Sequence, residues 1–160
     1  MNILQKISQD LMSPNEMLTN ILSIPFFIIE AYISINMFLT LFTKHVPRKN
    51  KYICMLILIF SSMISRFIIP VPFNTIFNIL MMVITYKIFL DGKLIEAFIG
   101  VIIQFLLTAL FEMISSQVYT LLFNRSYSEF ANYPIYSVIF MAIVYSCLFI
   151  MLKLFKKFNI

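Results

Sequence analysis

Five polar side chains recur at helical spacing along the longest hydrophobic stretch of the chain. They are Gln104, Thr108, Glu112, Ser115 and Tyr119, separated by four, four, three and four residues. At about 100° per residue, they fall within an arc of about 80° on one side of a helix. Their chemistry is hydrogen bonding and charge pairing. One face of this helix is therefore predicted to line a polar interior.

Other hydrophobic stretches also contain polar residues. The first contains Glu30 and Ser34, the second contains Arg66 near its end, and the third begins with Asn74 and Asn78. A charged side chain inside a bilayer costs a few kcal/mol unless it faces a partner or water. We therefore expect these residues and the polar stripe to line one cavity, which is the predicted ligand-binding site.

Two of these side chains have opposite charge and similar predicted depth. Arg66 and Glu112 fall in the outer halves of their helices, roughly 21 Å and 27 Å from the inner ends at a rise of about 1.5 Å per residue. An ion pair between them is geometrically possible, and it would either contact a ligand or only fix helix packing. Glu30 lies nearer mid-bilayer, where it would serve proton coupling or an interhelical hydrogen bond.

The composition indicates that these residues sit in a membrane protein. The chain has 160 residues, of which 61% are hydrophobic and 12% are charged, and its mean hydropathy is +0.95. These values lie outside the range of soluble domains. We predict an all-α membrane protein with a single transmembrane domain over residues 1–160, folded as a compact polytopic bundle.

Five stretches are long and apolar enough to cross the hydrocarbon core, which requires about 17 to 25 residues. The predicted spans are residues 18–42, 52–69, 73–90, 94–123 and 136–155. The fourth is the longest, so it should tilt or project beyond the bilayer. Prolines after the second span and Asp91-Gly92-Lys93 after the third predict tight antiparallel connections. Apolar residues at helical spacing within residues 3–12 favour a short N-terminal amphipathic helix, with a disordered terminus as the alternative.

Basic residues predict the orientation. Nine of the twelve lie between spans one and two, around the turn between spans three and four, or at the end of span five: Lys44, Arg48, Lys49, Lys51, Lys87, Lys93, Lys153, Lys156 and Lys157. Positive residues are retained in the cytoplasm, so we predict an outside N-terminus and a cytoplasmic C-terminus in the cell membrane. Topology and anionic lipid explain the net charge of +5. The predicted partner is the lipid bilayer and not nucleic acid.

Soluble catalytic machinery is not indicated. Cys54 and Cys147 lack metal-ligand spacing, and His45 is the only histidine. Neither glycine belongs to a phosphate-binding loop, and no nucleotide-binding or kinase signature occurs. We therefore expect no enzyme activity, no metal site and no cofactor.

Three segments carry a resemblance to a known family. They are Ile24-Pro25-Phe26-Phe27-Ile28-Ile29-Glu30-Ala31-Tyr32, Lys87-Ile88-Phe89-Leu90-Asp91-Gly92-Lys93 leading into the helix with Glu112, and Leu152-Lys153-Leu154-Phe155-Lys156-Lys157. From about Ile21 onward the chain resembles the transmembrane sensor region of AgrC-like receptor histidine kinases of the GHKL type. The resemblance implies a quorum-sensing receptor in a two-component system, which would bind a peptide or small hydrophobic ligand from outside.

The same resemblance implies a cytoplasmic kinase domain, or a homodimer, as the partner. The sequence stops at Ile160, where the kinase would begin. The resemblance therefore implies an excised sensor module, or a truncated relative that binds a signal without phosphorylating. Two alternatives remain open. One is a membrane substrate-binding subunit of an energy-coupling-factor type transporter, and the other is a structural protein whose polar residues hold the helices together.

Overall fold

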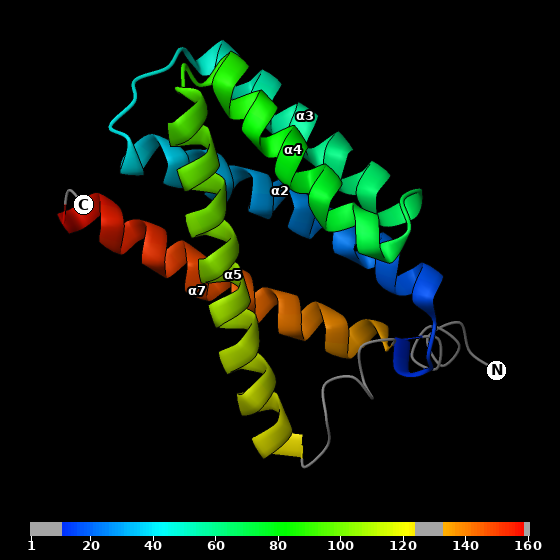
Figure 1. Cartoon of the computed structure of the whole chain (residues 1–160). Helices are drawn as coiled ribbons and strands as arrows, with labels where there is room; N and C mark the ends of the chain where they lie inside the picture. Colours follow the sequence, from blue (N-terminus) through cyan, green and yellow to red (C-terminus); the bar gives the residue numbers. More distant parts are fainter. Residues whose placement is uncertain (1–10, 124–132, 159–160) are drawn as a thin grey trace.

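The computed structural model describes residues 11–123 and 133–158, which form five long helices and no strand (Figure 1). The helices are α2 (Glu16–Leu41), α3 (Arg48–Phe67), α4 (Val71–Phe89), α5 (Leu94–Phe123) and α7 (Pro134–Phe158). Each of the five is long and apolar enough to cross a membrane. The predicted all-α, multi-pass membrane bundle is thereby confirmed. The predicted N-terminal amphipathic helix falls mostly on residues 1–10, which lie outside the described residues.

Helix boundaries follow from local chemistry. The side chain of Asn15 caps α2 by accepting a hydrogen bond of 3.0 Å from the backbone N–H of Leu18. Pro47 and Pro70 directly precede α3 and α4, where a missing N–H does no harm. At the start of α5, Glu96 accepts a bond of 2.9 Å from the backbone N–H of Lys93, as in a capping box. The helix α3 begins at Arg48, ahead of the predicted membrane span at residues 52–69. Its first turn is charged, and charged residues can extend a helix beyond the apolar core.

The helix α2 lies at the centre of the bundle. It packs against α3, α5 and α7, while α3 pairs with α4 and α5 also packs against α4 and α7. Figure 1 shows α5 crossing the direction of α2 and α7, and diverging from α4 after their shared turn. At 30 residues α5 is about 45 Å long, so a strong tilt lets it fit a hydrocarbon core of about 30 Å.

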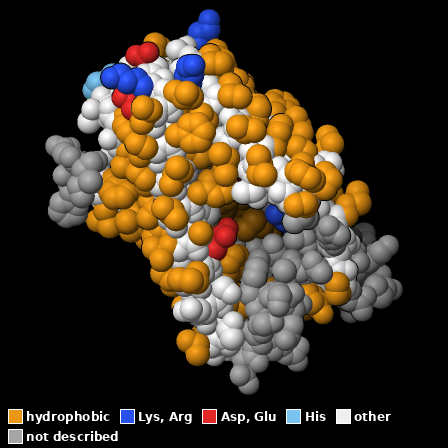
Figure 2. Space-filling model, in the orientation of Figure 1, with side chains coloured by type: hydrophobic (Ala, Val, Ile, Leu, Met, Phe, Trp, Pro, Cys, Tyr) orange, Lys and Arg blue, Asp and Glu red, His pale blue; other side chains and the backbone are white. Residues whose placement is uncertain are grey.

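The bundle has two distinct ends. The end that carries the α2–α3 turn, the α4–α5 turn and the last turn of α7 contains Lys44, Lys93 and Lys156, and we call it the basic end. Figure 2 shows blue side chains gathered at one end of the molecule, above a surface that is mostly orange. The opposite end carries the start of α2, the α3–α4 turn, the end of α5 and the start of α7.

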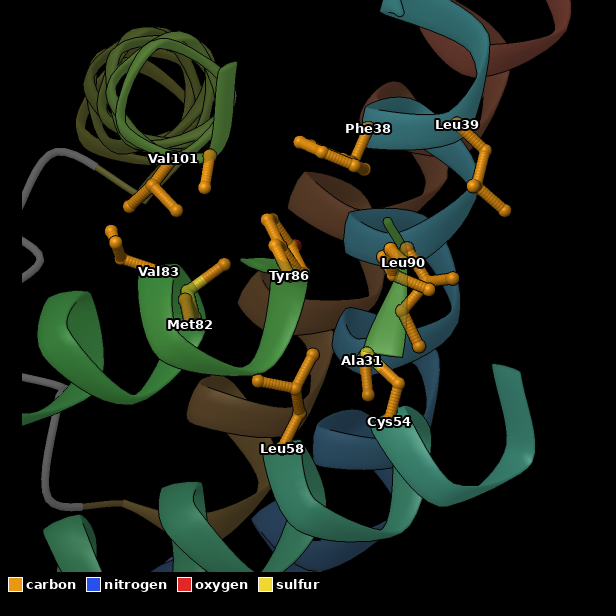
Figure 3. Packing of buried hydrophobic residues seen from close by; sticks show 12 residues of the cluster. Ala31, Phe38, Leu39, Cys54, Leu58, Met82, Val83, Tyr86, Leu90 and Val101 are labelled. Carbon is orange, nitrogen blue, oxygen red and sulfur yellow. The ribbon is translucent and has the colours of Figure 1, made fainter. Parts of the chain in front are cut away.

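The main apolar core lies toward the basic end and joins α2, α3, α4 and α5. Phe38 belongs to this core, and its ring lies 4.6 Å from that of Tyr86 between centroids (Figure 3). A Cβ atom added at Gly92 or Gly100 would lie 2.8 Å from the Phe38 ring. Both glycines of the chain thus make room for one aromatic side chain. The turn at residues 90–93 takes its left-handed residue from Asp91, whose φ is 52°, and not from Gly92.

Candidate functional site

A cavity of about 690 Å³ lies between the halves of the helices that are remote from the basic end. All five helices contribute polar side chains to it, including Glu30 of α2, Arg66 of α3, Asn74 and Asn78 of α4, Gln104, Thr108 and Glu112 of α5, and Tyr145 of α7. Figure 2 shows a hollow in the face turned to the viewer, with an acidic side chain at its rim and a basic one across it. Ligand pockets commonly have volumes of roughly 300 to 1,000 Å³.

The structure brings together seven of the ten residues that the sequence assigned to one cavity. The other three lie elsewhere. Ser34 lines a smaller adjoining void of about 40 Å³, and Ser115 and Tyr119 are buried away from the cavity. The ring of Tyr119 instead packs edge-on against Tyr136 of α7, at 6.2 Å between centroids. The polar stripe leaves the cavity because α5 crosses the bundle, so its last turns meet α7.

Arg66 forms a different contact from the one considered in the sequence. Its Nε donates to Oδ1 of Asn20 at 3.1 Å, across from α3 to α2. Within the described residues the one salt bridge joins Lys44 to Glu96 at 3.1 Å. Arg66 and Glu112 therefore line the same cavity without a direct ion pair.

Among the described residues, Glu30 receives one side-chain hydrogen bond inside the cavity. The hydroxyl of Tyr145 on α7 donates to Glu30 Oε2 at 3.2 Å. The Tyr145 ring stacks on Phe26 of α2 at 5.9 Å between centroids, which holds the hydroxyl in place. Sequence reasoning did not assign Tyr145 to the site. A tyrosine in an apolar span has no sequence signal that separates a cavity-facing ring from a lipid-facing one.

A buried chain of hydrogen bonds closes the cavity toward the apolar core. The hydroxyl of Tyr86 donates to Gln104 Oε1 at 3.2 Å, and Gln104 Nε2 donates to the hydroxyl of Ser34. Ser34 in turn donates to the backbone carbonyl of Glu30 at 2.6 Å. Gln104 thus has partners at both ends of its amide. Its first role is to join α2, α4 and α5.

The wall formed by α3 and α4 is also internally bonded. Asn78 Nδ2 donates to the hydroxyl of Ser65 at 3.0 Å, and that hydroxyl donates to the backbone carbonyl of Asn74 at 3.2 Å. The hydroxyl of Ser61 donates to Asn78 Oδ1 at 3.4 Å. The sequence did not assign Ser65 to the site. These bonds leave the carboxylates of Glu30 and Glu112 as the strongest acceptors that face the cavity.

Glu112 is exposed at the edge of the cavity, and no hydrogen bond or ion pair joins it to another described side chain.

Across residues 11–123 and 133–158, the His, Cys, Asp and Glu side chains form no group of three or more that could hold a metal ion. The polar and charged side chains that line the cavity could bind a ligand through hydrogen bonds and charge.

Comparison of the chain with protein-family models, curated proteins and solved structures finds no match.

Proposed function

We propose that the chain is a membrane signal-sensing module that binds an external ligand in the cavity and relays the binding to a cytoplasmic partner. The observation that carries the proposal is the position of the cavity, which lies in the halves of the helices opposite the basic end. With the basic end in the cytoplasm, the cavity lies in the outer half of the membrane. A ligand from outside then reaches it without crossing the bilayer.

The last helix provides the connection between the two ends. α7 contributes Ser137 and Tyr145 to the cavity, and its last turn carries Lys156 and Lys157. At the basic end, Lys156 Nζ donates to Asn36 Oδ1 of α2 at 3.3 Å. A ligand shifts such a helix only if it binds two arrangements with different affinity. In this proposal the ligand does so by contacting Tyr145 and Glu30 together.

The resemblance to AgrC-like sensor regions supports this role, with a kinase domain or a second copy of the chain as the partner. The proposal includes no catalytic step, because the polar groups serve binding and helix packing. The test is to fuse a histidine-kinase domain after Ile160 and to measure autophosphorylation in membranes with candidate extracellular peptides or culture supernatant. Output that changes with a ligand, and no longer does so in Tyr145→Phe, supports the relay. Constant output with ligands of confirmed binding contradicts it.

The volume of the cavity favours one second candidate. A cavity of about 690 Å³ could enclose a vitamin-sized metabolite, as a substrate-binding subunit of an energy-coupling-factor type transporter would require. This role needs an ATPase partner. Co-purification of the chain with an ATPase, together with ATP-dependent uptake of a metabolite, would favour transport over sensing.

A further inference from the structure

The cavity opens sideways between α4 and α5. The residues that these helices contribute to the main core lie toward their shared turn, and they include Tyr86 and Leu90 before it and Ala97 and Val101 after it. Beyond that point the two helices diverge (Figure 1), and the hollow in Figure 2 opens on a side of the bundle, between its two ends. In a membrane, that side faces lipid.

The edge of this opening can be identified on α5. Ala109 and Met113 line the cavity and are also exposed on the surface. Leu110, the next residue along, is 44% exposed but does not line the cavity. A molecule that enters past Ala109 therefore comes from hydrocarbon and carries an apolar portion.

The charges inside the cavity determine the other portion of the ligand. Two carboxylates, Glu30 and Glu112, face one guanidinium, and the guanidinium of Arg66 already donates to Asn20. When both carboxylates are ionised, the described part of the lining carries one more negative than positive charge. Aromatic rings of Phe27, Phe105 and Phe140 line the same space. Carboxylates beside aromatic faces recognise ammonium groups through charge and cation–π attraction.

We propose that the cavity binds an amphiphile with an ammonium headgroup, which enters from the outer leaflet between α4 and α5. The headgroup lies between Glu30 and Glu112, and the apolar tail leaves past Ala109 and Met113 into lipid. This inference rests on the proposed use of the cavity as a binding site and names the chemical class of its ligand.

Binding of radiolabelled decyltrimethylammonium to the purified full chain in maltoside micelles tests the proposal, with empty micelles as the blank. We expect saturable binding that Glu30→Gln and Glu112→Gln each weaken about tenfold or more, since each substitution removes a negative charge that attracts the quaternary ammonium. Glutamine at position 30 keeps an acceptor for Tyr145. Because Glu112 is exposed, its substitution leaves folding intact and keeps the test decisive.

Two matched tryptophans test the lateral opening. Ala109→Trp should weaken decyltrimethylammonium binding about tenfold or more by filling the opening, whereas Leu110→Trp should leave it unchanged. Decanoate, which has the same tail and a negative headgroup, should not compete. Equal binding of decanoate, or unchanged binding in both glutamine variants, would overturn the ammonium assignment. Equal effects of the two tryptophans would overturn the lateral route.

The result of the binding experiment can be distinguished from the result of the kinase-fusion experiment that tests signalling. Because the binding assay contains no kinase, decyltrimethylammonium can bind as expected while the fused kinase stays constant, which would contradict the relay alone. A kinase response to an external ligand, combined with no binding of decyltrimethylammonium, would contradict the ammonium amphiphile alone.

Discussion

The polar residues within the spans divide into those already engaged in bonding between helices and those that face the cavity with spare capacity. Gln104, Ser65 and Asn78 belong to the first group, since side chains on neighbouring helices satisfy their polar atoms. Glu30 has one bonded carboxylate oxygen, and Glu112 lies at the edge of the cavity. Substitutions in the first group should therefore lower the free energy of unfolding, whereas substitutions in the second group should reduce the response to ligand.

For the first group, Gln104→Leu should lower the free energy of unfolding by about 1 to 2 kcal/mol. The substitution removes the acceptor of the Tyr86 hydroxyl, and Tyr86 is fully buried. Unfolding in SDS titrations of the purified chain measures the change. The double variant with Tyr86→Phe should cost less than the sum of the two single variants, because both members of one bond are then absent. Strict additivity would contradict the coupling.

For the second group, Glu112→Leu should leave the unfolding free energy within about 0.5 kcal/mol of the original, because no bond to a described side chain is lost. It should abolish or strongly reduce the ligand response of the kinase fusion. Ile114→Leu is the control, because Ile114 is exposed and lies outside the cavity lining. A loss of stability with an intact response would instead support the structural role of the polar stripe.

Helical spacing predicted which residues of α5 share a face, but it contained no information on how α5 crosses its neighbours. Gln104, Thr108 and Glu112 reach the cavity, while Ser115 and Tyr119 lie on the same face beyond it. The bond of Arg66 to Asn20 and the position of Tyr145 likewise depend on how the helices are packed. The helices themselves were predictable because hydropathy and length are local properties.

At the scale of helices, α5 and the α4–α5 turn approach α2 closely because both glycines of the chain face Phe38. Small residues at helix crossings allow such approach where lipid removes the hydrophobic drive for association. Phe38 is 1% exposed, so its ring has little space into which it can move. The position of α5 across the bundle, and hence the lateral opening, depends on this contact.

Gly100→Val should therefore lower the free energy of unfolding by about 1 to 3 kcal/mol through overpacking against the ring. The gain in helix propensity from replacing glycine is under about 1 kcal/mol and does not offset this cost. Thermal unfolding in detergent provides the measurement, with Ile99→Val on the exposed side as the control. Adding Phe38→Leu should recover part of the loss in Gly100→Val. No recovery would show that the valine acts through another contact.

At the scale of the whole molecule, the two ends of the bundle differ in charge and in packing. The main core closes the basic end, whereas the cavity separates the helices in the opposite half. The number of spans and the charge asymmetry were predictable from the sequence, because each depends on residue types along the chain. The separation of the helices around the cavity was not predictable from the sequence, because it results from the tilt of the long helix α5 against the other helices.

The orientation in the membrane gives the last prediction. Asn50 lies in the first turn of α3 at the basic end, and Ile68 is 73% exposed beside the turn that follows α3. In a chain with Cys54 and Cys147 replaced by alanine, we expect a membrane-impermeant maleimide added to intact cells to label Ile68→Cys but not Asn50→Cys. Permeabilised cells should label both, because positive residues hold the basic end in the cytoplasm. Labelling of Asn50→Cys alone in intact cells would reverse the orientation and place the cavity in the inner half of the membrane, where an external ligand could not reach it directly.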